Sequence, residues 1–138
     1  MRSASRINAL SNPSETRPIA ISATGSVLLL LRAEALIEFA LAVSAYISIG
    51  GTWTLFAILF LAPDITMLGY LANPRAGARL YNAGHTYFTP ALLALAGFLM
   101  ASPLLYGPAL VWAAHIGFDR LLGYGLKYPA AFGVTHLG

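Results

Sequence analysis

The chain has 138 residues, a net charge of +3 at neutral pH and a mean hydropathy of +0.72. Hydrophobic residues make up 58% of it and charged residues 9%, against about 25% charged in ordinary soluble domains. So few charges cannot cover the surface of a short soluble chain, which excludes a soluble enzyme and a disordered protein. The absence of cysteine excludes a disulfide scaffold, thiol catalysis and thiolate-ligated metal. We therefore interpret the chain as an integral membrane protein.

The chain divides into a polar arm and an apolar domain. Residues 1–18 contain Arg2, Arg6 and Arg17 and show no apolar periodicity, which predicts a flexible cytoplasmic arm. Residues 19–138 are predicted to form one four-span membrane domain. Its first apolar stretch continues past Arg32 without a small-residue cleavage site, so we interpret it as an uncleaved span rather than a signal peptide.

Four apolar stretches follow one another at residues 26–49, 52–72, 76–101 and 104–124. Each is near the ~20 residues that a helix needs to cross the hydrocarbon core. Helices satisfy their own backbone hydrogen bonds in lipid, whereas short unpaired strands cannot. The turns after the first and third stretches are very short. The expected fold is thus all-α, a four-helix transmembrane bundle made of two tight helical hairpins.

The basic residues predict the orientation of this bundle. They lie before the first span, between the second and third, and at or after the end of the fourth, and the other two turns carry none. The positive-inside rule then places both termini in the cytoplasm. We interpret most of the tyrosines near this interface as an aromatic belt; they are Tyr70, Tyr81, Tyr124 and Tyr128.

Ionisable residues inside the spans are candidates for function, because burying them in lipid is costly. One residue from each predicted span falls at a similar depth, ~12–14 Å below the cytoplasmic surface at the helical rise; these are Glu34, Asp64, His85 and His115. Asp119 follows His115 by four residues and shares its helix face. Pro63 cannot donate a hydrogen bond to Leu59, which predicts a kink beside Asp64.

Two imidazoles and several carboxylates in one layer suit a divalent metal such as zinc, iron or manganese. The predicted ligands are Asp64, His85, His115, Asp119 and Glu34, with Asn82, Arg79 and His136 in a surrounding polar network. A closed structural or proton-relay network of the same residues is an open alternative. A haem between the two histidines is a further alternative, although the sequence has no attachment motif.

The C-terminal tail begins at about residue 125, and the residues after 129 are too few to form another span. We expect it to fold back and to bring His136 near the polar layer, with Lys127 and Tyr128 at the lipid headgroups.

Several motifs resemble a known family. They are LRAE (31–34), FLAPDITMLGY (60–70), YNAGHTY (81–87), HIGFDRLLGYGLKYP (115–129) and the closing THLG (135–138). Over about residues 28–138 the chain resembles the small bacterial membrane family catalogued as domain of unknown function number 4260. The resemblance implies a multi-pass protein of the bacterial cytoplasmic (inner) membrane. It implies no activity, substrate or cofactor.

Two functions from different classes remain. The first is an intramembrane metal-binding protein, hydrolase-like, that acts on a lipid-like or amphiphilic molecule; the metal would lower the pKa of a bound water and Glu38 would move protons. The second is a non-enzymatic carrier, proton-coupled factor or accessory subunit. The expected surroundings are the lipid bilayer. Topology and anionic headgroups account for the positive charge, so we predict no nucleic-acid partner.

Overall fold

The computed structural model describes residues 23–129 and 133–137, and regular structure in that part of the chain is helical. The α-helices are α1 (Gly25–Ser48), α2 (Trp53–Phe60), α3 (Pro74–Gly84), α4 (Phe88–Leu99) and α5 (Tyr106–Leu122). Two 3-10 helices, η3 (Pro63–Leu71) and η4 (Pro103–Leu105), join them. The all-α class is therefore confirmed. The predicted arm, residues 1–18, lies outside the described residues.

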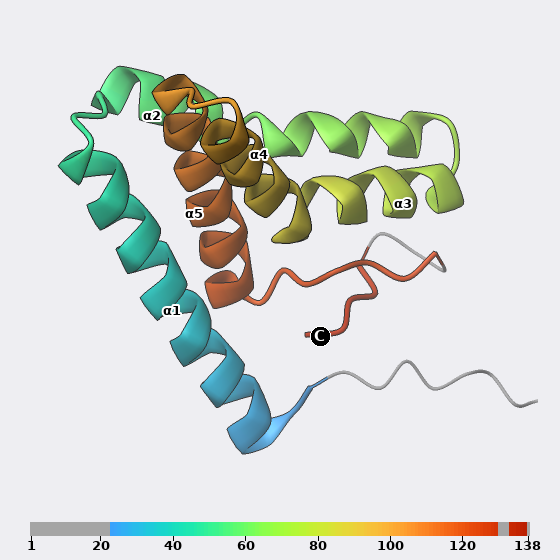
Figure 1. Ribbon diagram of the computed structural model, residues 1–138. Helices are drawn as coiled ribbons and strands as arrows, with labels where there is room; N and C mark the ends of the chain where they lie inside the picture. The colour runs from blue at the N-terminus through green and yellow to red at the C-terminus, as the bar shows by residue number, and fades with distance from the viewer. Residues whose placement is uncertain (1–22, 130–132, 138) are drawn as a thin grey trace, which may run out of the picture.

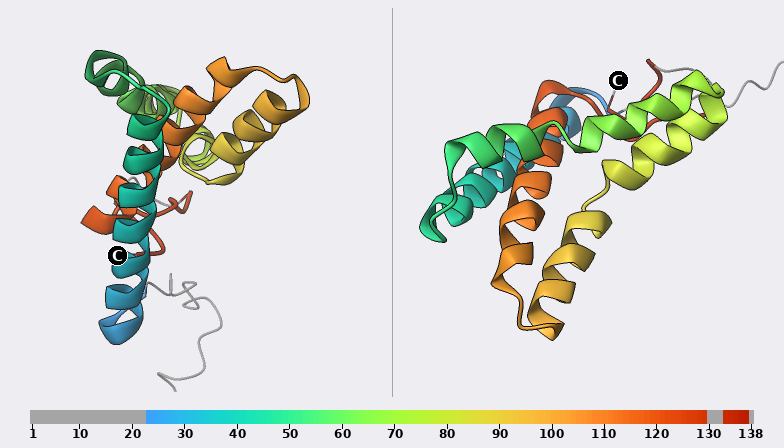
Figure 2. Two further views of the ribbon diagram at one scale, coloured as in Figure 1. Left: turned by 60° about the vertical axis from the view of Figure 1, so that its left-hand side comes forward. Right: turned by 90° about the horizontal axis from the view of Figure 1, so that it is seen from above.

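The helices form two groups, one packed around α5 and one made of η3 and α3. The long helix α1 packs along α5, and α4 returns beside α5 through η4 (Figure 1). The second group is η3 with α3, which lie against each other and extend to one side of α5 (Figures 1 and 2). The C-terminal segment runs back below α3 in Figure 1. The arrangement leaves η3, the end of α3 and the second half of α5 next to one another.

Small residues bring α1 and α5 close together. A β-carbon on Gly117 of α5 would lie 3.1 Å from the Phe39 amide nitrogen and 3.2 Å from the Ala35 carbonyl oxygen of α1. Ala35 and Ala42 are buried on the same side of α1. Close backbone approach through small residues is a common way for apolar helices to associate. Beside this contact the rings of Phe39 and Phe118 pack with centroids 5.7 Å apart.

Two of the predicted continuous helices are interrupted, so the described part has five α-helices rather than four uniform spans. The kink expected at Pro63 is confirmed: α2 ends at Phe60 and the chain continues as a 3-10 helix from Pro63. The third stretch breaks between Gly84 and Phe88. Pro90 lacks the amide hydrogen that would bond the Thr86 carbonyl, which explains why an α-helix cannot run through this point.

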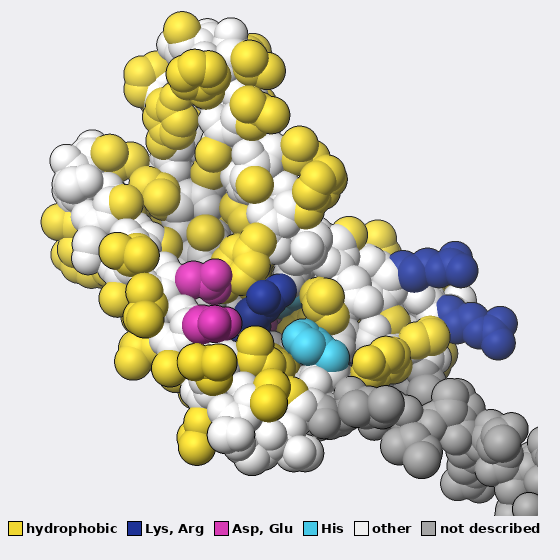
Figure 3. Space-filling view, turned by 60° about the horizontal axis from the view of Figure 1, so that its bottom comes forward, with side chains coloured by type: hydrophobic (Ala, Val, Ile, Leu, Met, Phe, Trp, Pro, Cys, Tyr) yellow, Lys and Arg dark blue, Asp and Glu magenta, His cyan; other side chains and the backbone are white. Residues whose placement is uncertain are grey.

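A four-helix transmembrane bundle is not confirmed. Within the described residues one helical stretch, Trp53–Leu71, is long and apolar enough to cross a membrane, and α4 is apolar but shorter. Helix α1 is longer, but it carries Arg32, Glu34 and Glu38. One such stretch is a weak indication of membrane association by itself. Large hydrophobic side chains are nevertheless exposed along most elements, and they cover much of the face shown in Figure 3. Acidic side chains lie near the middle of that face, and basic side chains lie both there and at its right-hand edge.

Candidate metal centre

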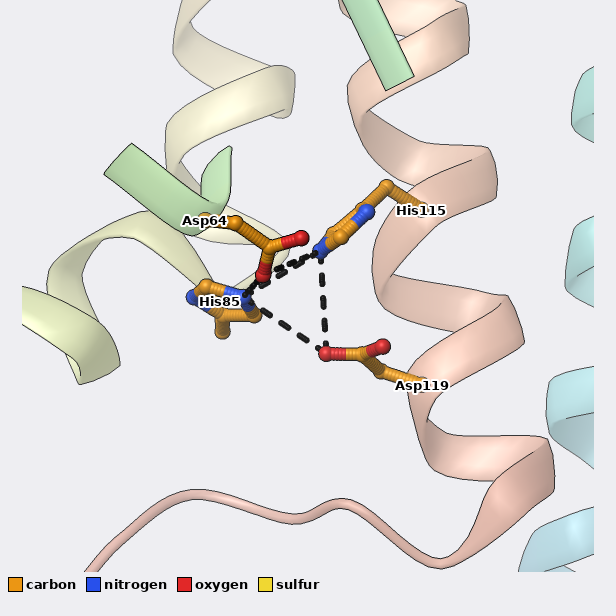
Figure 4. A group of neighbouring side chains, drawn as sticks. All are labelled: Asp64, His85, His115 and Asp119. Carbon is orange, nitrogen blue, oxygen red and sulfur yellow. Dashed lines mark hydrogen bonds and ion pairs between the residues drawn. The ribbon is translucent and has the colours of Figure 1, made fainter. Parts of the chain in front are cut away.

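Four side chains from three elements converge on one point (Figure 4). Asp64 comes from the first turn of η3, His85 follows the last residue of α3, and His115 and Asp119 lie one turn apart on α5. One nitrogen or oxygen atom from each lies within 4.8 Å of the others. The histidines are 3% and 2% exposed, so both imidazoles are removed from solvent. The structure therefore brings together four of the five ligands expected from the sequence.

Five of the six distances between these atoms are 3.2–3.6 Å, and the sixth, between the two carboxylate oxygens, is no more than 4.8 Å. The two Nε2 atoms are 3.2 Å apart. His85 Nε2 lies 3.5 Å from Asp64 Oδ1 and 3.5 Å from Asp119 Oδ2, and the same distances from His115 Nε2 are 3.6 Å. Ligands about 2.0–2.2 Å from a tetrahedral ion are separated by about 3.3–3.6 Å, whereas neighbouring ligands of an octahedral ion are separated by about 2.8–3.1 Å. The five distances that involve a histidine lie near the tetrahedral separation, and all four atoms are close enough together to hold one ion in common.

The two imidazoles lie within hydrogen-bond distance of each other, with Nε2 atoms 3.2 Å apart, but the carboxylates lie farther from them than direct hydrogen bonds. Nitrogen–oxygen hydrogen bonds are about 2.7–3.2 Å long, and the four imidazole–carboxylate separations exceed that range. His85 Nδ1 lies 2.9 Å from the Tyr81 carbonyl oxygen, which can only accept. Nδ1 of neutral His85 therefore carries the hydrogen, and its Nε2 presents a lone pair to the common point. A shared cation would satisfy all four atoms at once.

The break after α3 places His85. The indole Nε1 of Trp112, on α5, donates a 2.7 Å hydrogen bond to the carbonyl of Gly84, the last residue of α3. A β-carbon on Gly84 would lie 2.7 Å from the Thr66 side chain, so this end of α3 also fits tightly against η3. The hydroxyl of Thr89 bonds the Ala83 carbonyl across the break. The exposed carbonyls of the helix end are thus satisfied while His85 turns towards α5.

Aromatic rings hold the two imidazoles. The Tyr81 ring stacks on His85 with centroids 3.7 Å apart and planes 10° from parallel. The Tyr81 hydroxyl donates to Asp119 Oδ2 at 3.3 Å. Phe60 meets the His115 ring edge-on at 5.0 Å. Tyr81 is only 3% exposed, so among the four tyrosines of the predicted aromatic belt it is one that does not belong to such a belt. Sequence reasoning missed its role, although its spacing of four residues before His85 was a usable signal.

Glu34 and Glu38 do not join the group. Both are exposed on α1. The neighbouring Ala35 and Phe39 face Gly117, and His115 lies two residues from Gly117 on α5. Two residues correspond to ~200° around a helix, so α1 packs on roughly the opposite side of α5 from the histidine. Equal depth along the helices was therefore insufficient to bring Glu34 to the other residues.

The expected polar network is found in a different place. Asn82 bonds both backbone groups of Lys127: its Nδ2 donates to the carbonyl at 2.8 Å, and its Oδ1 accepts from the amide at 2.7 Å. His136 Nδ1 accepts from the Leu126 amide at 2.8 Å, and its amide donates to the Leu126 carbonyl at 3.2 Å. Arg79 is exposed. Asn82 and His136 thus hold the C-terminal segment and are not part of the four-residue group.

Lys127 lies beside the centre rather than at the lipid headgroups, so that expectation is wrong. The residue is 6% exposed, and its Nζ lies 4.6 Å from the centroid of the Tyr81 ring. Burial lowers the pKa of Lys127, and the nearby Asp119 charge partly opposes this effect. The chain reaches this position because Gly123, in a left-handed conformation at φ 98°, ends α5 and turns the segment back.

A pocket of about 290 Å³ opens beside the two carboxylates. The side chain of Asp64 is 41% exposed and that of Asp119 17%, so solvent reaches the centre from this direction. The pocket is lined by Asp64, Met67, Tyr81, Asp119, Tyr124 and Lys127. In the candidate metal centre formed by Asp64, His85, His115 and Asp119, the two imidazoles are therefore closed off from solvent and the two carboxylates are accessible to it.

The chain belongs to the family described as Domain of unknown function (DUF4260), whose model matches residues 28–138. The resemblance recognised from the motifs is thus confirmed. No curated protein and no solved structure matches the chain significantly.

Proposed function

We propose that this protein binds one divalent metal ion through Asp64, His85, His115 and Asp119. The observation that carries the proposal is the convergence of four donor atoms on one point, with distances of 3.2–3.6 Å for the five pairs that involve a histidine. Two neutral imidazoles and two carboxylates offset the charge of a divalent ion, which a half-buried site requires. Among zinc, iron and manganese, zinc fits best, because it favours four tetrahedral nitrogen and oxygen ligands.

Elemental analysis of the detergent-purified full chain tests the proposal. We expect about one equivalent of metal in the native protein and none in His115→Ala or His85→Ala. Glu34→Gln is the matched control: it alters an ionisable residue at the same expected depth that lies outside the group, so its metal content should equal that of the native chain. If the native protein contains no metal after purification and still binds none after incubation with zinc, the proposal is refuted.

The melting temperature with and without a strong chelator gives a second measurement. A ligand present at 100 times its dissociation constant stabilises the folded state by ~2.7 kcal/mol, so chelation should lower the melting temperature by several degrees. Chelator should not affect His115→Ala further. If native protein melts identically under both conditions, the four residues form a structural or proton-relay network, as a non-enzymatic carrier or accessory subunit would require.

We place the centre in a protein of the bacterial inner membrane that crosses the bilayer several times with both termini inside. The apolar composition, the exposed hydrophobic side chains and the one-sided distribution of basic residues support this setting. A lipid bilayer would cover the exposed hydrophobic side chains. The interruptions of the second and third stretches fall at the site, where irregular backbone is tolerated because protein surrounds it.

Hydrolysis of an amphiphilic substrate is a second candidate, favoured by the pocket that reaches the centre from the carboxylate side. Glu38 is not placed to serve as the proton-transfer group, because it is exposed on α1 and outside the four-residue group. A medium-chain p-nitrophenyl ester provides the test. Zinc-loaded native protein should release p-nitrophenol faster than His115→Ala at equal concentration, and equal rates would leave metal binding without hydrolysis.

A further inference from the structure

The pocket beside the centre combines charged and apolar walls. Asp64, Asp119 and Lys127 contribute charged groups to it, and Met67 and Tyr124 contribute apolar surface. Tyr124 is 56% exposed, so it stands at the rim, whereas Lys127 is buried. A small polar group with an attached hydrocarbon chain would match this distribution, since its polar end would enter and its chain would remain near the rim.

Metal binding reverses the sign of the charge in this pocket. Without an ion, the formal charges of the residues that line the pocket, two carboxylates and one ammonium, sum to one negative. A divalent ion changes this balance to one positive. The pocket should therefore repel an anion in the metal-free protein and attract one in the metal-loaded protein, and this attraction is strengthened by partial burial.

The position of Lys127 is determined by the fold. Asn82 bonds the amide and carbonyl of this residue, which fixes the backbone from which the side chain extends. The side-chain Nζ lies over the Tyr81 ring, 4.6 Å from the ring centroid. Tyr81 in turn contacts both His85 and Asp119. A cation is thus held on the accessible side of the centre by residues that also support the ligands.

We infer that this pocket binds an anionic oxygen group, phosphate or carboxylate, next to the bound metal, and that Lys127 supplies the second positive charge that recognises it. The inference deepens the proposed metal-binding function and rests on it. The anion approaches from the side of Asp64, the most exposed of the four ligands, so it reaches the ion without displacing the buried histidines. A charge-assisted contact of this kind contributes about tenfold or more to affinity.

Cobalt substitution makes the binding visible. Co²⁺ in a tetrahedral site absorbs in the visible range, and an anion that approaches the ion changes that spectrum. We would load the full-length native chain with Co²⁺ in detergent and titrate it with inorganic phosphate. The expected result is a saturable spectral change whose midpoint rises at least about tenfold in Lys127→Gln. Elemental analysis should show the same Co²⁺ content in both proteins, which excludes a folding defect.

Arg75→Gln is the matched control, because it removes the same charge from an exposed position that does not line this pocket. Its midpoint should equal that of the native chain, and Lys127→Arg should retain most of the binding. A spectrum insensitive to phosphate, or an equal loss in Lys127→Gln and Arg75→Gln, would overturn the inference while the metal centre stands. Failure to retain Co²⁺ or zinc would instead refute the proposed function itself.

A second titration with a short-chain alkyl phosphate distinguishes the two sources of the anion. Tighter binding than inorganic phosphate, again weakened in Lys127→Gln, would indicate a lipid-like ligand whose chain contacts Met67 and Tyr124. Equal affinity would indicate a free anion from the aqueous phase. Binding of either compound supports the site, and binding of neither overturns it.

Discussion

Tyr81→Phe tests whether the stacked tyrosine positions the metal ligands. The substitution keeps the ring that lies 3.7 Å from the His85 ring and removes the hydroxyl that donates to Asp119 Oδ2 at 3.3 Å. Hydrogen bonds to charged groups contribute about 1.5–3 kcal/mol, and 3.3 Å is long for an O–H donor, so the lower end applies. About 1.4 kcal/mol corresponds to a tenfold higher dissociation constant for the metal. A tenfold loss of affinity is usual when a residue that supports a metal ligand is replaced.

The assay is competition between detergent-purified protein and a chromogenic chelator of known zinc affinity. Tyr106→Phe is the control, because it removes a hydroxyl from the apolar pocket between α4 and α5, away from the centre. We expect about tenfold weaker binding in Tyr81→Phe, no change in Tyr106→Phe and a larger loss in Tyr81→Leu, which also removes the stacked ring. Native affinity in Tyr81→Phe would refute the positioning role, and an equal loss in Tyr106→Phe would attribute the effect to general destabilisation.

Three further predictions concern the tail and the topology. Asn82→Ala should destabilise the fold by ~1–3 kcal/mol and speed hydrogen exchange of the Lys127 amide, because it removes both hydrogen bonds to that residue. Asn73→Ala is the control: it removes one capping hydrogen bond from the start of α3 and should leave exchange at Lys127 unchanged. Burial lowers the pKa of His136, so the unfolded chain binds a proton there at a higher pH than the folded chain, and the folded state should lose stability as the pH drops below ~6.5. In the presence of chelator, the melting temperature of His136→Gln should decrease less between pH 7.5 and 5.5 than that of the native chain. An equal decrease would show that His136 is not the group responsible. Reporter fusions after residues 51 and 103 should report periplasm and fusions after residue 74 and at the C-terminus cytoplasm; a periplasmic C-terminus would contradict the proposed orientation.

The helical class, the apolar surface and the chemical types of the ligands could be predicted from the amino-acid sequence, because they depend on composition and on spacing within one element. The four-residue separation of His115 and Asp119 places both on one face of any α-helix, whatever surrounds it. The interruption at Pro63 is equally local, since it follows from a missing backbone hydrogen. The sequence therefore singled out all four residues that the structure brings together.

Packing between distant segments determined the rest. Gly117 allows α1 to approach one side of α5, and this contact keeps Glu34 away from the side of α5 that carries His115. The similar depth predicted for Glu34 and His115 did not reveal this separation. The bond from Trp112 to Gly84 positions His85 at a helix end that the continuous apolar pattern concealed. Asn82 draws Lys127 over Tyr81, so that a lysine expected at the headgroups is buried beside the carboxylates. These positions depend on contacts between residues about 30 to 80 positions apart, which periodicity within one helix does not encode.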